Sequence, residues 1–170
     1  YEIVDCDWSS DVCSSDLLMV DRGRITRFPR GQALPHSTIY TVTQDQAGRV
    51  WFGGDGGLSL FADGAFHTIT HAQGLPAGRA VVAVADDDRG DLWIGLSFFG
   101  FIRLGRDELT RALADASYQI GPRHVYDTVD GTAGVPDYYA NSGVRGPRGA
   151  LWFLTGRGLT VFDPASLHAR

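Results

Sequence analysis

The stretch DQAGRVWFGG at residues 45–54 recurs 42 residues later as DDRGDLWIGL at residues 87–96. A third copy, GPRGALWFLT at residues 146–155, has Gly146 where the first two copies have Asp. The positions that define the repeat are Asp45, Gly48, Trp51, Gly53, Asp87, Gly90, Trp93, Gly95, Gly149 and Trp152. Similarity at a fixed period indicates a repeat protein, in which each unit is one small structural module.

Flanking residues extend the repeat on both sides of the tryptophan. An apolar-Pro pair precedes each Trp by 16 or 17 residues, with the prolines at Pro35, Pro76 and Pro136. The stretch RGRITRF at residues 22–28 also aligns with DGAFHTI at residues 63–69. We therefore expect units at about 18–30 (partial), 34–71, 75–130 and 135–163, followed by an exit segment at 164–170.

Each unit reads as four strands. In the first complete unit these are TIYTVTQ (38–44), the Trp segment, GLSLFA (57–62) and AFHTI (65–69), with turn residues between them. In D-x-x-G, Asp favours the start of the turn and Gly supplies the positive φ that closes the hairpin. Four short antiparallel strands in about 41 residues make one β-propeller blade. The predicted fold is all-β: a β-propeller fragment of about three four-stranded antiparallel blades.

The recurring tryptophan is predicted to be structural. It lies in the second strand of each blade, where its large ring can be buried between neighbouring blades. Gly53 and Gly95, two residues after Trp51 and Trp93, indicate close approach of another part of the backbone. Regular recurrence favours this core role over a ligand cage.

One segment departs from the strand pattern. GRDELTRALADASY at residues 105–118 has apolar residues at helical spacing, at Leu109, Leu113 and Ala116. It predicts a short helical insertion after the third strand of the second complete blade. Insertions in repeat proteins often lie on the binding face, and the alternative is a solvated decoration.

The first seventeen residues, YEIVDCDWSSDVCSSDL, have no apolar periodicity. Back-translated, they resemble a short-read sequencing adapter, so residues 1–17 are interpreted as a non-native, disordered leader and excluded from the fold. Both cysteines lie in it, so cysteine usage does not indicate a redox compartment. Without the leader, 15 acidic residues balance 15 basic residues, all of them Arg. Because three-odd blades cannot close a ring, we expect the chain to be a piece of a longer protein.

The blade pattern L-P-x16-W, with D-x-x-G-x-[VL]-W-[FI]-G and a following Gly-Leu, resembles the two-component regulator propeller repeat. The resemblance covers residues 18–163, and its third copy is the weakest because of Gly146 and Leu154. It implies the sensor region of a bacterial histidine kinase or related signalling protein. Such a region lies outside the cytoplasm, in the periplasm or outside the cell. It also implies further blades, an immunoglobulin-like domain after Asp163-Pro164, and a dimeric parent protein.

The sequence contains no recognisable catalytic, cofactor or metal constellation. His67 and His71 lie four residues apart, which on a strand is roughly 13 Å and too far for one metal ion. The run Asp86, Asp87 and Asp88 lacks the ligand spacing of a calcium loop and is interpreted as a solvated turn. The sequence has no Arg cluster dense enough to predict nucleic-acid binding. It also has no run of about 18 apolar residues, so we expect no membrane contact by this segment.

Candidate ligand-binding residues are Tyr138, Tyr139 and Asn141, which interrupt the apolar first strand of the third blade. They would meet a small polar ligand such as a glycan, or a neighbouring domain. The favoured hypothesis is a non-catalytic, ligand-sensing propeller. The alternatives are a propeller hydrolase or lyase whose active site lies in other blades, and a purely structural interaction propeller. At the aligned first-strand positions, the pairs Tyr40/Val82 and Val42/Val84 are apolar instead of His, Asp, Glu or Asn, which favours the sensor.

Overall fold

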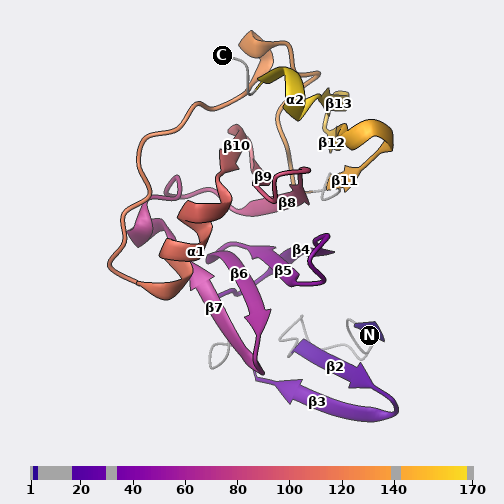
Figure 1. The fold of residues 1–170 in the computed structure, drawn as a ribbon, viewed down its shortest axis with the longest axis vertical. Coiled ribbons are helices and arrows are strands. Elements are labelled where there is room, and N and C mark those ends of the chain that lie inside the picture. The colour runs from indigo at the N-terminus through magenta and orange to yellow at the C-terminus, as the bar shows by residue number, and fades with distance from the viewer. Residues whose placement is uncertain (1, 4–16, 30–33, 139–142, 168–170) are drawn as a thin grey trace.

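The computed structural model describes residues 2–3, 17–29, 34–138 and 143–167. In this part of the chain, four antiparallel sheets follow one another in an arc (Figure 1). Sheet A contains β1 (Glu2–Ile3), β2 (Leu17–Asp21) and β3 (Arg24–Phe28). Sheet B contains β4 (Ile39–Gln44), β5 (Val50–Gly54), β6 (Gly57–Ala62) and β7 (Ala65–Ile69). Sheet C contains β8 (Val81–Asp86), β9 (Leu92–Leu96) and β10 (Gly100–Leu104), and sheet D contains β11 (Gly143–Arg145), β12 (Leu151–Thr155) and β13 (Gly158–Phe162).

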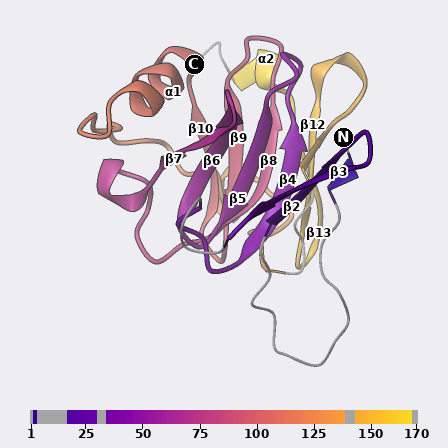
Figure 2. The ribbon, with the colours of Figure 1, turned by 90° about the horizontal axis from the view of Figure 1, so that it is seen from below.

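The sheets are successive blades, as the repeat predicts. Strands in each sheet pair in sequence order, and the first strands of neighbouring sheets, β4 with β8 and β8 with β11, lie in contact. Figure 2, which is turned by 90° from Figure 1, shows β4 and β8 side by side. The described chain is therefore an all-β propeller fragment.

Sheet B matches the predicted blade most closely. Its four strands fall on the four predicted segments, and the Asp63-Gly64 turn between β6 and β7 has positive φ at both residues, +52° and +77°. This is the geometry that joins two adjacent strands with only two residues. Because side chains alternate along each strand, one face of sheet B is directed to sheet A and the other to sheet C.

Two apolar cores join sheets B, C and D. Between B and C, Trp51 is fully buried with aliphatic residues from both sheets, among them Leu58 and Ile94. Between C and D, Trp93 is fully buried with Phe101 and Phe153. The tryptophans thus occupy second strands at blade interfaces, as predicted.

Sheets C and D depart from four strands in the part of the chain that is described. The fourth strand of sheet C is reduced to one bridge, in which Phe101 and Tyr126 exchange N–H to carbonyl bonds of 2.9 and 2.8 Å. Gly121-Pro122 precede this bridge, and proline has no N–H to give to a ladder. After β13 the chain turns into the short helix α2 (Pro164–Leu167).

The predicted insertion is the helix α1 (Arg106–Ala114). It buries Leu109 and Ala112 and packs near β7, and Gln73 Nε2 donates to the Ala112 carbonyl at 2.7 Å. Gln73 belongs to the 3-10 turn η1 (His71–Gln73), which ends the first complete unit. The helix is thus a packed part of the fold instead of a solvated decoration. Two further 3-10 turns are η2 (Thr128–Asp130) and η3 (Pro147–Gly149).

The leader enters the structure at both of its ends. Glu2 and Ile3 form β1, which pairs with β2 opposite Val20 and Met19, and Leu17 is the first residue of β2. Strand β2 therefore begins one residue before the predicted unit. The remainder of the leader lies outside the described residues, and its interpretation as adapter sequence stays a prediction.

Candidate functional site: the entry face of the blades

The blades expose two different ends. Because the strands are antiparallel, the links that enter β4, β8 and β11 lie at the same end as the turns β5–β6, β9–β10 and β12–β13. We call this end the entry face. The D-x-x-G turns, which join β4 to β5 and β8 to β9, lie at the opposite end, which we call the turn face. The corresponding G-P-R-G turn joins β11 to β12 at the same end.

On the turn face, Asp45 organises its own hairpin. Its Oδ1 accepts hydrogen bonds from the N–H groups of Ala47 and Arg49 at 3.0 and 2.9 Å, and Gly48 has a φ of +79°. Its Oδ2 accepts from Trp51 Nε1 at 2.8 Å. Burial opposes ionisation, but these bonds from Trp51 and Arg49 outweigh it and hold the pKa of Asp45 below its ordinary value. The Asp of the repeat therefore both shapes the turn and holds the indole.

The second copy repeats this arrangement. Asp87 Oδ1 accepts from the N–H groups of Arg89 and Asp91 at 2.9 and 3.1 Å, and Asp87 Oδ2 accepts from Trp93 Nε1 at 3.1 Å. Gly90 has a φ of +78°. The spacing of six residues between Asp and Trp is thus set by the reach of the carboxylate to the indole N–H.

The third copy lacks the acceptor. With Gly146 at the position of the Asp, Trp152 Nε1 is buried without a hydrogen-bond partner among the described residues. A Cβ on Gly146 would lie 2.2 Å from Trp152 Nε1, so the indole occupies the space that a side chain would need. Gly149 keeps the positive φ of the turn, +76°.

The glycines two residues after Trp51 and Trp93 lie in tight contact with the next blade, and at Gly53 this contact includes the backbone, as predicted. A Cβ on Gly53 would lie 2.6 Å from Val81 Cγ1 and 2.7 Å from the Val81 carbonyl of the next blade. A Cβ on Gly95 would lie 3.0 Å from Pro136, the proline of the next repeat. At Pro136, therefore, the link to sheet D crosses sheet C.

The aspartate run does more than form a solvated turn. Asp86 Oδ2 accepts from the backbone N–H and the Nε2 of Gln46 in the preceding blade, both at 3.0 Å. Asp88 forms an ion pair with Arg145 of the following blade. Asp87 accepts hydrogen bonds within its own turn. The three aspartates therefore connect sheets B, C and D along the turn face.

On the entry face, three aromatic rings from three successive blades meet. Tyr40 is the second residue of β4, the first strand of sheet B. Phe98 lies in the β9–β10 turn of sheet C, and Tyr138 lies in the link to sheet D. The ring centroids are 4.9 Å apart for Tyr40 and Tyr138 and 5.3 Å apart for Phe98 and Tyr138. Phe98 is 54% exposed and Tyr138 is 39% exposed, so the rings form an open surface, the aromatic platform.

The platform is tied to the backbone beneath it. Phe98 N–H donates to the Pro136 carbonyl at 2.7 Å, which joins the β9–β10 turn to the segment that carries Tyr138. Arg79 Nη1 lies 3.4 Å from the Phe98 carbonyl, and its guanidinium lies 5.4 Å from the centre of the Phe99 ring. Burial and the neighbouring Tyr138 raise the pKa of Tyr40, so its phenol is neutral at physiological pH.

The titratable groups near the platform are engaged in the fold. Asp55 accepts from the backbone N–H groups of Ser37 and Thr38 at 2.8 and 3.1 Å. His36 accepts from Gly56 N–H at 3.1 Å and lies 2.8 Å from Ser59 Oγ, so both ring nitrogens have partners. Burial lowers the pKa of His36, although the Asp55 carboxylate opposes this. Among the residues described, no three His, Cys, Asp or Glu side chains gather as metal ligands.

Of the predicted ligand residues, the structure describes Tyr138 and places it in the platform; Tyr139 and Asn141 lie outside the described residues. Sequence reasoning missed Phe98 and Arg79 and treated Tyr40 only as a non-catalytic channel position. Val82 and Val84 are fully buried, and Val42 is 43% exposed. One available signal is that Phe98 replaces a Gly-rich turn, where it takes a φ of +51° that bulky residues rarely adopt.

Comparison with known proteins agrees with this architecture. The family described as two component regulator propeller matches residues 33–56. The extracellular domain of a putative one-component system from B. thetaiotaomicron superposes with a TM-score of 0.66 at 16% identity, over 90% of this chain and 22% of that chain. The extracellular domain of a putative hybrid two-component system from the same organism gives a TM-score of 0.53 at 15% identity, over 86% of this chain and 17% of that one.

A streptogramin B lyase structure has the same fold, with a TM-score of 0.56 at 18% identity over 88% of this chain and 48% of that chain. No curated protein matches the sequence. The chain spans less than half the length of each of these solved chains. In the described part of the chain, no helix is long and apolar enough to cross a membrane. Residues 33–56 thus resemble a two-component regulator propeller repeat, and the described chain is a β-propeller fragment of successive antiparallel blades.

Proposed function

We propose that this chain is part of the extracytoplasmic, ligand-sensing propeller of a bacterial two-component signalling protein and is not itself catalytic. The family match at residues 33–56 supports this role, as do structural neighbours that are extracellular domains of putative one-component and hybrid two-component systems. By the same reasoning the propeller would lie in the periplasm or outside the cell.

The observation that carries the proposal is the aromatic platform. Aromatic rings that only fill a core are buried, whereas Phe98 and Tyr138 are 54% and 39% exposed. Exposed aromatic faces beside a guanidinium suit a ligand with both apolar C–H faces and hydroxyl groups, such as an oligosaccharide. Because each ring comes from a different blade, a ligand on the platform would contact three blades at once.

A catalytic role has less support. The lyase neighbour is 18% identical, a level at which similarity extends to the fold alone. A general acid or base needs a group free to exchange a proton with substrate. Near the platform, Asp55 and His36 are instead bound to the backbone and to Ser59.

Further blades of the same parent chain are the proposed partners of sheet D. The face of sheet D opposite sheet C exposes an apolar set whose members are 45–59% exposed: Val144, Leu154, Leu159 and Val161. Trp152 lies in the same row, opposite Val144 and Val161. In sheets B and C the corresponding Trp face is covered by the next blade. An immunoglobulin-like domain after Asp163-Pro164 and a dimeric parent are further parts of the proposal.

A glycan array probed with the purified chain tests the ligand proposal. We expect binding to one class of oligosaccharide, and at least a tenfold loss of affinity for Tyr138→Ala and for Phe98→Ala. Val129→Ala is the control, because Val129 is 93% exposed and is not one of the three platform rings. An array without binding, or binding that the platform variants leave unchanged, would contradict the proposal.

A further inference from the structure

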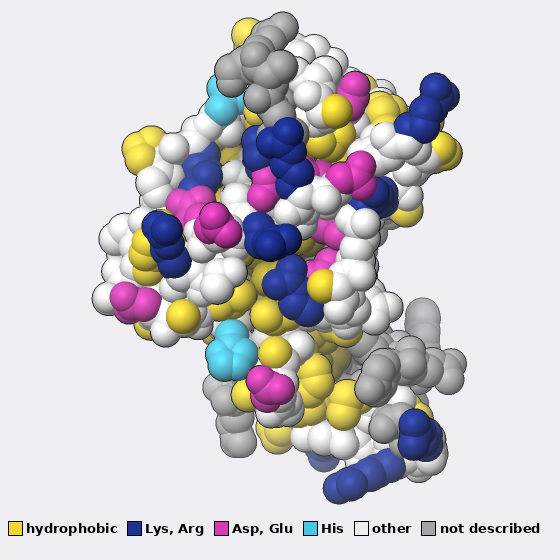
Figure 3. All heavy atoms as spheres, viewed as in Figure 1, with side chains coloured by type: hydrophobic (Ala, Val, Ile, Leu, Met, Phe, Trp, Pro, Cys, Tyr) yellow, Lys and Arg dark blue, Asp and Glu magenta, His cyan; other side chains and the backbone are white. Residues whose placement is uncertain are grey.

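A polar cleft of ≈ 360 Å³ opens beside the start of α1. Figure 3 shows Arg and acidic side chains interspersed on the face of the molecule that carries α1. The charged and aromatic side chains that line the cleft are Arg103, Glu108, Arg123, His124 and Tyr126. All of them belong to residues 34–138, which the structure describes without a gap. A cleft of this volume has room for a small ligand.

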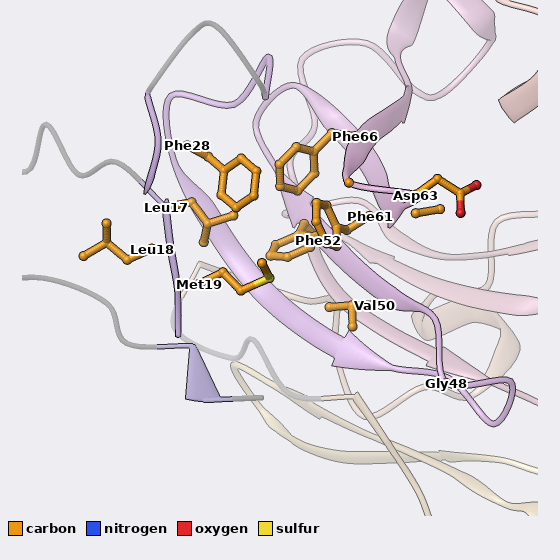
Figure 4. Close-up of a pocket in the computed structure, with 12 residues that line it drawn as sticks. Leu17, Leu18, Met19, Phe28, Gly48, Val50, Phe52, Phe61, Asp63 and Phe66 are labelled. Atoms are coloured by element: carbon orange, nitrogen blue, oxygen red, sulfur yellow. The ribbon is translucent and has the colours of Figure 1, made fainter. Parts of the chain in front are cut away.

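A second hollow, the apolar pocket between sheets A and B, has a different chemistry. Its volume is ≈ 390 Å³, and Figure 4 shows Leu17 and Phe28 of sheet A directed toward Phe52 and Phe61 of sheet B. Among the described residues that line it, Asp63 carries the one charge. Of the two hollows, the cleft beside α1 is therefore the one with guanidinium donors in its walls.

Two guanidinium groups lie close together in the cleft. Arg123 Nη1 donates to the Arg103 carbonyl at 3.3 Å, and Arg123 Nη2 forms an ion pair with Glu108. Arg103 is paired with Asp91, with 2.9 Å between Arg103 Nε and Asp91 Oδ2. Burial and the nearby charge of Arg103 lower the pKa of Arg123. Because a guanidinium stays charged in a protein, the two groups repel each other, and an anion beside both would offset this repulsion.

Several donors of the cleft have no acceptor among the described residues. Arg123 Nε is buried without a partner, and Arg103 Nη1 has none. The Tyr126 hydroxyl is likewise unbonded in this part of the chain, while its ring lies 5.3 Å from that of Trp93 and 4.5 Å from that of His124. A donor without an acceptor costs free energy when it is removed from water. The unpaired polar atoms of the cleft are therefore mainly donors, which select a ligand rich in acceptors.

We propose that the cleft beside α1 binds a tetrahedral oxyanion, a phosphate or sulfate group, with Arg103, Arg123 and Tyr126 as its donors. Four oxygens at the corners of a tetrahedron accept from donors that approach from several sides, whereas the two oxygens of a carboxylate lie in one plane. The Glu108 carboxylate already contacts Arg123, so its charge competes with the bound anion. The inference is independent of the proposed ligand at the entry face, because none of the three platform rings lines the cleft.

Calorimetric titration of the full chain with inorganic phosphate, sulfate and acetate tests the anion. At equal ionic strength, where screening is the same, phosphate and sulfate should bind at least about tenfold more tightly than acetate. Phosphate at ten times its Kd should raise Tm by about 4 °C. A sugar phosphate that binds more tightly than phosphate would assign the group to an ester, and equal affinity would assign it to the free anion. Absent binding of phosphate and sulfate, or acetate binding of equal strength, would overturn the proposal.

Substitutions in the cleft should change phosphate affinity in opposite directions. Tyr126→Phe, which removes only a hydroxyl, and Arg103→Gln should each weaken binding at least about fivefold. Glu108→Gln removes the competing charge and should tighten binding about threefold. Arg111→Gln is the matched control, because Arg111 is an exposed residue of α1 that does not line the cleft. An equal loss for Arg111→Gln and Arg103→Gln, or weaker binding by Glu108→Gln, would contradict the assignment.

Discussion

The turns of sheets B and C differ from the turn of sheet D by one side chain. In the first two, Asp45 and Asp87 accept from the indole N–H groups of Trp51 and Trp93, which are fully buried at blade interfaces. In sheet D, Gly146 leaves the nitrogen of Trp152 without a partner among the described residues, and the ring is partly exposed. The comparison teaches that the Asp of the repeat fixes the orientation of the indole where a following blade covers it.

The packing of the blades around Trp51 and Trp93 also determines the arrangement of the aromatic rings on the entry face. Tyr40, Phe98 and Tyr138 come from three blades, so their 4.9 and 5.3 Å contacts depend on how the blades pack. Trp51 and Trp93 are the largest side chains in the two cores that set this packing. The turn face therefore supports the platform from the opposite end of the sheets.

Removing a ring should have the largest effect, and the size should depend on the blade. Trp93→Ala is expected to cost about 3–5 kcal/mol of unfolding free energy, because it leaves a cavity in a closed core. Trp152→Ala should cost about 1–2 kcal/mol, because its ring is already partly exposed. Urea denaturation followed by circular dichroism measures both. Equal costs would show that the two rings are buried alike.

Removing the acceptor should have the next largest effect. Asp87→Ala is expected to cost about 2–3 kcal/mol, because it leaves the Trp93 N–H buried and unpaired and removes the cap of the turn. Gly146→Asp should fail to stabilise sheet D, since the new Cβ meets the indole nitrogen at 2.2 Å. A gain in Tm for Gly146→Asp would show that the third turn is an incomplete version of the other two.

Substitutions two positions after Trp51 and Trp152 compare a covered blade interface with the exposed face of sheet D. Gly53→Ala should cost about 1–3 kcal/mol, because the added methyl meets Val81 of the next blade. Gly121→Ala is a matched control, since nothing lies within 4 Å of its Cβ position. Leu154 is the aligned residue of sheet D and is 45% exposed, so Leu154→Ala should cost under about 1 kcal/mol. Similar losses at positions 53 and 154 would contradict the contrast.

The smallest effect concerns pH. The pKa of Asp45 is lowered in the folded state, so its bonds stabilise the protein above the ordinary carboxyl pKa of 3.8. This contribution is lost as pH falls from about 4 through the lower folded value. Thermal melts between pH 2 and pH 6 should therefore show a shallower decline for Asp45→Asn than for the parent chain. Parallel curves would mean that Asp45 keeps its ordinary pKa.

Much of the blade could be predicted because its determinants are local. Asp63-Gly64 forms the expected two-residue turn, Gly48 and Gly90 take positive φ, and the helical spacing around Leu109 becomes α1. Each of these outcomes depends on residues only a few positions apart. The period of the repeat then places the same elements in the next blade.

The platform could not be predicted in the same way. Tyr40 and Tyr138 are 98 positions apart in the sequence, and only the packing of whole blades brings their rings together. The links made by Asp86 and Asp88 likewise depend on the distance between turns of neighbouring blades. The single bridge between Tyr126 and Phe101, in place of a fourth strand, likewise joins residues 25 positions apart.

Hydrogen exchange of the indole N–H groups, measured by ¹⁵N NMR and assigned with single Trp→Phe variants, tests most directly whether the Asp holds the indole. We predict slow exchange for Trp51 and Trp93, and fast exchange for Trp152, whose nitrogen has no acceptor among the described residues. Asp45→Asn and Asp87→Asn should each shift only the signal of their own tryptophan. Equal exchange at all three indoles, or signals insensitive to the two Asp variants, would contradict the account.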